Sequence, residues 1–292
     1  NAQTEVRSRG FGACHGVALL SGRRDARSPA SVVSRRNSLY MLRNNGASAA
    51  VAIGCLIILW ASAQLLFAPA ETLFPGPWTT GLTWWQEWRV WGPHAMATGG
   101  LMTISLLAAL FFAVPMAYMM TVSFRFRAAV ESVFLTLQCL PLFVMTPILV
   151  AMVGWGWTTV LIPSFLSVLV SLCITLFKGV ETVPKPYMEL FRSFQMKSWS
   201  IFWSVQLPYS LPALFAGLRV AIASAATSVL AAEFAGGQQG LGMLIQESRR
   251  NFDLPMAFAS ILSVASLAGL FVGGCMMAER IVLGRRRDAI AH

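Results

Sequence analysis

The chain has 292 residues and a formal net charge of +10, and 56% of its residues are hydrophobic while only 12% are charged. Soluble domains carry about 25% charged residues, so this composition excludes an ordinary soluble domain. The apolar residues form runs able to cross a bilayer, which takes about 20 residues for about 30 Å of hydrocarbon. No basic stretch outside these runs is interleaved with aromatic residues. The positive charge therefore predicts membrane orientation and contact with lipid headgroups, and no nucleic-acid partner.

Residues 1–40 differ in composition from the rest of the chain. They are rich in Arg and Ser, hold only Glu5 and Asp25 as acidic residues, and begin with Asn1. Met41 stands immediately before the first apolar run. We expect residues 1–40 to be a disordered or spurious extension, with Met41 as the start of translation. The alternative is an organelle transit peptide, which has the same composition.

The apolar runs predict an all-α membrane protein with about six transmembrane helices. The expected spans are 47–68, 94–121, 130–153, 158–177, 213–235 and 256–283. Pro141 and Pro147 lie inside the third span and are expected to kink it, which a membrane tolerates where neighbouring helices satisfy the freed carbonyls. The expected parts are a first helix with an outer segment (41–93), a main bundle (94–283) and a basic tail (284–292).

The outer segment after the first span is rich in tryptophan. Its tryptophans are Trp78, Trp84, Trp85, Trp88 and Trp91. We expect an interfacial aromatic belt, because Trp is enriched where membrane meets water. A solute-binding cage is the alternative.

Basic residues predict how the chain crosses the membrane. With six spans, both termini and the loops after the second and fourth spans share one side, and 13 of the 17 Lys and Arg beyond residue 34 lie there. The opposite side holds only Arg89, Arg249 and Arg250. Because cytoplasmic loops carry an excess of Lys and Arg, we expect both termini and the segment 178–212 in the cytoplasm.

The polar segment 178–212, between the fourth and fifth spans, is long for a simple connection, since connections of about 4–6 residues are usual. Leu190, Phe191 and Phe194 give it helix-like apolar spacing, and it ends in a proline, Pro212. We therefore expect a folded cytoplasmic element that docks a soluble partner. A short amphipathic hairpin lying on lipid is the alternative.

Two charged residues fall in the predicted fifth span. Glu233 lies near its outer end, and an ionised side chain at mid-membrane costs about 2.5–3.5 kcal/mol on insertion scales. Glu233 therefore either lines a solute path or caps a turn before Gly236 and Gly237. Arg219, nearer the cytoplasm, is expected to snorkel to headgroups, with pairing inside the bundle as the alternative. Small residues such as Gly217 predict close packing against another span or a second copy.

Motifs for chemistry are absent from the sequence. There is no G-x-x-x-x-G-K-[ST] phosphate loop, no H-E-x-x-H and no G-x-S-x-G. The cysteines and histidines are scattered, which predicts neither a metal site nor a disulfide framework. We expect no catalytic residue and no cofactor. Uphill movement of a solute would then draw energy from an ion gradient or from another protein.

The segment 178–212 carries a recognisable spacing. Glu189, Val205, Leu207 and Pro208 resemble the cytoplasmic "EAA" loop of permease subunits in binding-protein-dependent ABC importers. That pattern is Glu-Ala-Ala, three residues, Gly, nine residues, Ile, one residue, Leu-Pro. The match places Glu189, Leu207 and Pro208 in register, with Val205 in the place of the Ile.

The segment also departs from that pattern. Leu190 and Phe191 replace the two alanines, and Gln195 replaces the glycine. A glycine there permits a sharp turn between two short helices. We therefore expect Gln195 to alter the turn, or its fit to the partner.

Further segments resemble one branch of these importers, which transports nitrate, sulfonates, taurine and thiamine precursors. Residues 233–245, which include Gly240 and Gly242, are similar to the segment that follows the fifth span in this branch. Residues 73–77 and 216–219 are also similar to it. Together these matches cover nearly everything from about residue 47 to residue 283.

The resemblance implies a type I-like permease bundle in a bacterial inner membrane. It implies docking to a dimeric ABC ATPase, delivery of solute by an extracytoplasmic binding protein, and pairing with a second permease copy. The segment 178–212 would then be a coupling loop, and the chain would do no covalent chemistry. A secondary transporter or channel driven by an ion gradient is the alternative.

The resemblance also assigns roles to residues. The expected coupling residues are Glu189, Leu190, Phe191, Phe194, Gln195, Val205, Leu207 and Pro208. The Glu189 carboxylate would cap helix amides or meet a basic residue of the ATPase, while Phe202 would join the apolar residues in a groove of that partner. Pro208 and Pro212 would stiffen the return into the fifth span. The residues expected at a translocation path or gate are Glu233, Arg219, Gly240 and Gly242.

Overall fold

The computed structural model describes residues 51, 53–65 and 74–290. The chain divides into two units, 1–56 and 57–292, and the expected extension 1–40 lies outside the described residues. An apolar helix, Ile53–Leu65, covers the described part of the first expected span.

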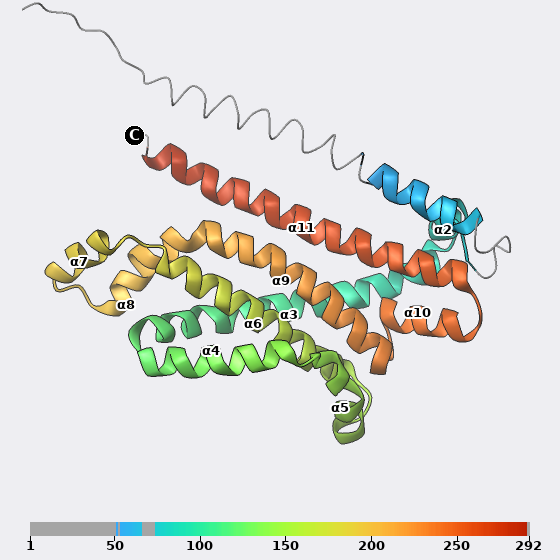
Figure 1. The fold of residues 1–292 in the computed structure, drawn as a ribbon, viewed down its shortest axis with the longest axis horizontal. Helices are drawn as coiled ribbons and strands as arrows, with labels where there is room; N and C mark the ends of the chain where they lie inside the picture. The colour runs from blue at the N-terminus through green and yellow to red at the C-terminus, as the bar shows by residue number, and fades with distance from the viewer. Residues whose placement is uncertain (1–50, 52, 66–73, 291–292) are drawn as a thin grey trace, which may run out of the picture. The chain divides into compact units, whose positions relative to one another are not determined.

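Helices make up nearly all of the described chain, and the described ranges hold no strand. In chain order they are α2 Pro77–Gln86, α3 Trp88–Val122, α4 Phe124–Cys139, a 3-10 turn Leu142–Met145, α5 Thr146–Val153, α6 Trp157–Glu181, α7 Lys185–Ser193, α8 Ser198–Ile201, a π-helical turn Phe202–Gln206, α9 Leu207–Gly236, α10 Leu241–Arg250 and α11 Leu254–Ile290 (Figure 1). This confirms the predicted all-α class.

Among the described residues, four helices are long and apolar enough to cross a membrane. They are Trp88–Val122, Trp157–Glu181, Ser198–Gly236 and Leu254–Gly284. They contain the second, fourth, fifth and sixth expected spans and extend beyond each of them. The largest share of the added length precedes the fifth span, where the helical residues 198–212 mix apolar side chains with serines and prolines.

The third expected span is not one kinked helix over 130–153. α4 ends at Cys139, Leu140 is extended (φ −90°, ψ 127°), and Pro141 follows. A proline cannot donate a helical hydrogen bond, and it disfavours helical backbone in the residue before it. The chain resumes as a 3-10 turn and then as α5, which has Pro147 in its first turn, where proline is tolerated.

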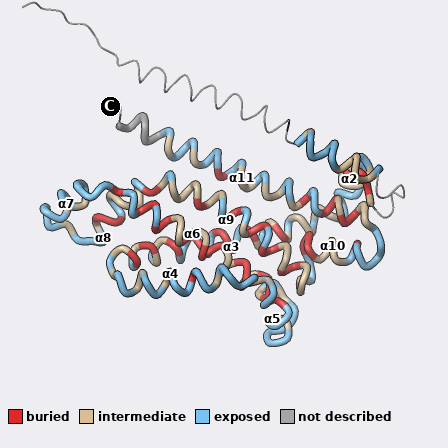
Figure 2. Tube along the Cα trace, viewed as in Figure 1, coloured by how far each residue is buried: buried red, intermediate tan, exposed pale blue. Residues whose placement is uncertain are grey.

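The core lies where α3, α6 and α9 pack together, and Figure 2 shows buried residues along all three helices. Small residues allow this close approach. A Cβ added at Gly217 of α9 would lie 2.7 Å from the Cβ of Thr175 on α6, and one added at Gly179 of α6 would lie 2.5 Å from the Cβ of Ala213. The small residues of α9 near Gly217 therefore pack against another span of the same chain.

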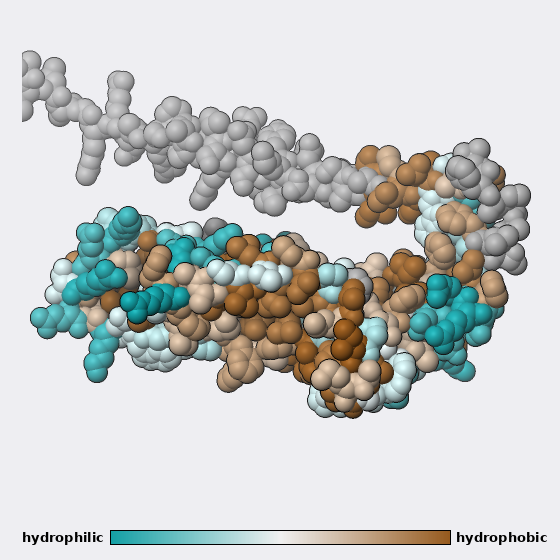
Figure 3. All heavy atoms as spheres, turned by 60° about the horizontal axis from the view of Figure 1, so that its bottom comes forward, coloured by the Kyte–Doolittle hydropathy of each residue, from teal (hydrophilic) through white to brown (hydrophobic). Residues whose placement is uncertain are grey.

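The outer face of the bundle is apolar. Large side chains such as Phe111 of α3 (73% exposed) and Leu270 of α11 (73% exposed) point away from the core. On the face drawn in Figure 3, hydrophobic residues fill the middle and hydrophilic residues gather towards the ends. This distribution suits helices surrounded by lipid.

The tryptophans of the outer segment divide into two groups. Trp84 and Trp91 stack with ring centroids 5.1 Å apart, and the Trp84 Nε1–H donates to the Ser263 hydroxyl at 2.9 Å. Trp78 and Trp85 are 77% and 75% exposed. The belt therefore remains a prediction for the exposed tryptophans, whereas Trp84 and Trp91 link α2 and α3 to α11.

Candidate functional site

The segment 178–212 has its own helices, as its apolar spacing predicts. α6 runs on to Glu181, and α7 follows as a separate helix. From Ser198 the chain is continuously helical to Gly236. The polar interruption is therefore shorter than expected and consists mainly of α7 and the turn after it.

α7 projects from the end of the bundle and packs against little of it (Figure 1). None of its nine described residues is buried. Tyr187, Leu190 and Phe194, at the end of the helix, are 56%, 51% and 70% exposed. Their spacing of three and four residues puts them on one face of the helix. An exposed apolar face of this kind is typical of a surface that another protein covers.

Glu189 lies on α7 with its carboxylate in solvent. Among the residues that the structure describes, the carboxylate has no hydrogen-bond or ion-pair partner, while the backbone carbonyl of Glu189 accepts from the Ser193 hydroxyl at 2.9 Å. The charged group is therefore available to a partner.

The turn after α7 has the geometry that a glycine usually provides. Gln195 has φ 54°, in the left-handed region. The Gln195 N–H donates to the Arg192 carbonyl at 2.9 Å, and the Met196 N–H donates to the Phe191 carbonyl at 3.3 Å. These two bonds form a Schellman motif, in which glycine is preferred at the left-handed position. Gln195 thus adopts a left-handed backbone conformation that costs conformational energy in a residue with a side chain.

Phe202 does not belong to the exposed surface, so the prediction that it fills a groove on a partner is wrong. Its side chain is fully buried, with its ring centroid 5.2 Å from that of Tyr118 at the end of α3. Trp199 and Trp203 surround this pair and remain 53% and 44% exposed. Sequence reasoning missed Tyr118, because only tertiary packing brings α3 to α8.

The motif residues at the other end of the loop are half-buried: Val205 lies in the π-helical turn, and Leu207 and Pro208 lie at the start of α9. The chain enters α9 through a π-helical turn, in which the Leu207 N–H donates to the Phe202 carbonyl. Pro208 and Pro212 supply no N–H to the helix. Leu207 packs against the hydrophobic core, so the entry to α9 is tied to the bundle.

A charged cluster joins α4 to the end of α6, beside the start of α7. The Arg127 guanidinium lies 2.6 Å from the Glu181 carboxylate and 3.0 Å from the Glu131 carboxylate, and it covers the ring of Phe177 at 4.6 Å. Sequence reasoning used Arg127 only for orientation. The spacing of Arg127 and Glu131 by four residues on a helix was the available signal.

At the opposite end of the bundle, Glu233 is fully buried and caps α10. Its carboxylate accepts from the Gly242 N–H at 3.0 Å and from the Thr98 hydroxyl of α3 at 2.9 Å, and the same hydroxyl oxygen accepts from the Leu241 N–H at 2.9 Å. The carboxylate thus caps a turn, but it is the turn into α10 and not the expected one before Gly236 and Gly237. A role of Glu233 in a gate stays a prediction.

The two glycines predicted beside Glu233 serve this packing. Gly240 has φ 109°, and a Cβ there would lie 2.2 Å from the Glu233 carboxyl carbon. A Cβ at Gly242 would lie 2.3 Å from the Leu230 carbonyl oxygen. The Gly240 N–H also donates to His94 Nδ1 at 3.2 Å. Sequence reasoning found the glycines and Glu233 but missed Thr98.

Arg219 pairs inside the bundle and does not snorkel alone, so the expectation of snorkelling is wrong. Its guanidinium forms an ion pair with Glu279 of α11. Both side chains are partly exposed, at 35% and 25%. The pair links α9 to α11. Because its two residues are 60 apart in the sequence, local sequence patterns did not predict it.

The spanning helices define a class of protein, a polytopic membrane protein, and the exposed α7 lies at one end of its bundle. A profile of the family described as "Binding-protein-dependent transport system inner membrane component" matches residues 105–282. The chain belongs to this family. It is therefore the membrane-spanning subunit of an ABC importer, in a bacterial inner membrane, and this family works with an ATPase and a solute-binding protein.

Comparison with known proteins agrees with the resemblance seen in the sequence. A probable ABC transporter permease protein of Haemophilus influenzae is 23% identical over 74% of this chain and 88% of that protein. The formylaminopyrimidine transport permease protein ThiX of Halalkalibacterium halodurans is 25% identical over 66% of this chain and 78% of that protein. A solved inward-facing structure of the MetNI methionine ABC transporter shares the fold, with a TM-score of 0.57 and 16% identity over 65% of this chain and 94% of that one.

Proposed function

We propose that the protein couples ATP hydrolysis by a partner ATPase to uptake of a small solute of the nitrate, sulfonate, taurine or pyrimidine thiamine-precursor type. The resemblance of residues 233–245 to that branch and the similarity to a formylaminopyrimidine permease support this range of solutes. The chain itself forms the route for the solute and switches its access from one side of the membrane to the other, and it performs no covalent chemistry. The alternative is an ion-gradient-driven transporter or channel.

The exposed face of α7 is the observation that carries this proposal. Leu190 and Phe194 would be costly to leave in water, at about 25 cal/mol per Å² of apolar surface, and nothing in the described bundle covers them. Beside them, the free Glu189 carboxylate gives the surface a charge. An ATPase with a matching apolar groove and a basic residue would satisfy both features.

The same geometry supports a path for movement. The Schellman turn at Gln195 connects α7 to the continuous helix that runs from Ser198 to Gly236, and the Arg127 cluster ties α4 to the end of α6, which leads into α7. A shift of α7 on closure of the ATPase would therefore move α9 and α4 together. Such rigid-body motion of packed helices changes access without local unfolding.

The proposal includes a complete assembly. Two copies of this chain pair around a route, a dimeric ATPase covers the cytoplasmic ends, and a binding protein docks on the outer face. Both termini lie in the cytoplasm, in keeping with the basic residues. Lipid surrounds the exposed apolar side chains of α3 and α11.

Replacement of Glu189 by arginine tests the coupling role. We expect Glu189→Arg to abolish co-purification of the ATPase, or to leave ATP hydrolysis intact while uptake in proteoliposomes falls at least about tenfold. Glu247→Arg is the matched control, because Glu247 is also an exposed glutamate on a short helix, α10. Normal assembly and normal ATP-driven uptake by Glu189→Arg would refute the coupling role. Uptake that stops with an ionophore and persists without ATP would favour the alternative.

A further inference from the structure

The interruption between α4 and α5 lies within the membrane. α4 spans 16 residues from its cytoplasmic start, which is about 24 Å at 1.5 Å per residue. Leu140 and Pro141 therefore fall inside the hydrocarbon layer, which is about 30 Å thick. Non-helical backbone at such depth occurs only where it is buried in protein or lines a water-filled cavity.

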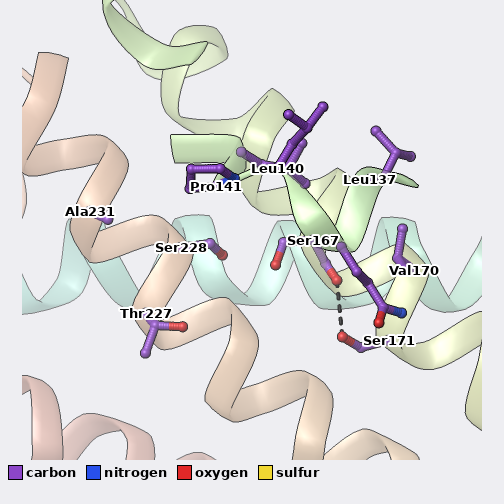
Figure 4. Close-up of a pocket in the computed structure, with 11 residues that line it drawn as sticks. Leu137, Leu140, Pro141, Ser167, Val170, Ser171, Thr227, Ser228 and Ala231 are labelled. Atoms are coloured by element: carbon purple, nitrogen blue, oxygen red, sulfur yellow. Dashed lines mark hydrogen bonds between the residues drawn. The ribbon is translucent and has the colours of Figure 1, made fainter. Parts of the chain in front are cut away.

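A cavity of about 410 Å³ lies at this interruption, between α4, α6 and α9. Figure 4 shows Leu140 and Pro141 beside Ser167 and Ser171 of α6, with Thr227 and Ser228 of α9 across from them. Ser167 lies about 15 Å along α6 from its outer end, and Thr227 about 14 Å from the outer end of α9, at 1.5 Å per residue. The hydroxyls of this cavity are thus near the middle of the membrane.

Three of the hydroxyls that line the cavity already donate their hydrogens to helix carbonyls, so they meet a solute as acceptors; the Ser171 hydroxyl also lies 3.3 Å from that of Ser224. Ser171 donates to the Ser167 carbonyl at 3.1 Å, Thr227 to the Ala223 carbonyl at 3.0 Å, and Ser228 to the Ser224 carbonyl at 2.6 Å. The carboxyl-terminal end of α4 adds the negative end of a helix dipole. Among the described residues that line the cavity none carries a charge, and Gln138 adds a neutral amide that can both donate and accept.

We infer that this cavity holds the transported solute at mid-membrane, and that it accepts a solute presenting N–H donors and disfavours a free inorganic anion. An N–H-bearing heterocycle or amine would satisfy the acceptor oxygens of Ser171, Thr227 and Ser228. An anion would lose its hydration and meet no cation, which is costly in a medium of low dielectric constant. The inference rests on the proposed import function, and within its range of solutes it favours the pyrimidine type over nitrate.

Thiol labelling tests the cavity and does not require that the solute be identified. Thr227→Cys is introduced after the native cysteines are replaced by serine or alanine, and the assembled importer is placed in proteoliposomes without nucleotide. Two charged reagents are compared: 2-(trimethylammonium)ethyl methanethiosulfonate and 2-sulfonatoethyl methanethiosulfonate. Each rate is divided by the rate of the same reagent with free 2-mercaptoethanol. We expect the cationic reagent to react faster, by about tenfold.

Two results would overturn the inference: an anionic rate that equals or exceeds the cationic one, or no reaction with either reagent. Ser171→Cys, on α6, repeats the measurement if Thr227→Cys does not assemble. Thr136→Cys is the matched control, because Thr136 is an exposed threonine of α4 whose hydroxyl also donates to a carbonyl four residues earlier. It lies outside the cavity and should react with neither reagent. Labelling of the cavity depends on its access to water and not on Glu189. The labelling result is therefore independent of the Glu189→Arg experiment that tests the coupling proposal.

Discussion

Gln195 carries a backbone conformation that its side chain does not favour. A left-handed conformation costs a non-glycine residue about 1–2 kcal/mol. Phe252, at the end of α10, has φ 59° and ends its helix in the same way, with the Phe252 N–H donating to the Arg249 carbonyl and the Asp253 N–H to the Ser248 carbonyl. At both positions the hydrogen bonds to carbonyls of the preceding helix offset the conformational cost of the left-handed residue.

Gln195→Gly should therefore stabilise the turn after α7, by about 1 kcal/mol. The expected result is a higher thermal unfolding midpoint in detergent. Gln206→Gly is the control, because Gln206 has φ −67° within the helical run, where glycine costs about 1 kcal/mol. Equal shifts for the two variants would contradict the left-handed geometry of Gln195.

The Glu233 carboxylate accepts hydrogen bonds from two buried donors, the Gly242 N–H and the Thr98 hydroxyl. Glu233→Ala should leave the Gly242 N–H and the Thr98 hydroxyl unpaired and open a cavity, lowering stability by about 3 kcal/mol. The same change at the exposed Glu247 should alter stability by no more than about 0.5 kcal/mol. Thermal unfolding of both variants in detergent measures the difference. An unchanged midpoint for Glu233→Ala, with altered uptake, would favour a gate over a cap.

At the scale of helices, the ion pair between Arg219 and Glu279 adds a polar link between α9 and α11, which also pack together through apolar side chains of the core. A charge left alone in the bundle is destabilising, whereas hydrogen bonds between membrane helices contribute about 0.6–2 kcal/mol. The pair therefore orients α11 against α9. It also explains how an arginine is accommodated in a predicted span.

A charge exchange tests this orientation. Arg219→Glu should place two carboxylates together and lower the thermal midpoint, while Arg219→Glu combined with Glu279→Arg should restore most of the loss, with a coupling energy of about 1–2 kcal/mol. Arg250→Glu, at an exposed site on α10, controls for a change of net charge. Additive effects of Arg219→Glu and Glu279→Arg would show that the residues act independently.

For the whole molecule, the distribution of Lys and Arg along the chain predicts its orientation in the membrane. The turn between α9 and α10 should face outward and α7 should face the cytoplasm, because the basic residues flank α7. With the native cysteines replaced, Gln238→Cys should react with a membrane-impermeant maleimide in intact cells, whereas Ser193→Cys should react only after permeabilisation. Both positions are exposed, so accessibility alone does not separate them. The reverse pattern would invert the topology.

Several features could be predicted from local sequence. Hydrophobic length predicted the spanning helices, and the spacing of Leu190 and Phe194 predicted the helix α7, because both depend on residues within a short window. Pro141 and Pro147 signalled an irregularity in the third span. Its form, an interruption followed by a 3-10 turn in which the Val144 N–H donates to the Pro141 carbonyl, was not predicted from the two prolines alone.

The sequence by itself determined the membrane class, and it predicted the side of each loop and the proposed coupling residues, since hydrophobicity, charge and motif spacing are properties of the chain alone. Only the tertiary structure decided which side chains meet. It buried Phe202 against Tyr118, paired Arg219 with Glu279, and joined Glu233 to Thr98 across a sequence separation of 135 residues. Burial and pairing of this kind depend on which helix faces pack together, and no local window of the sequence contains that information.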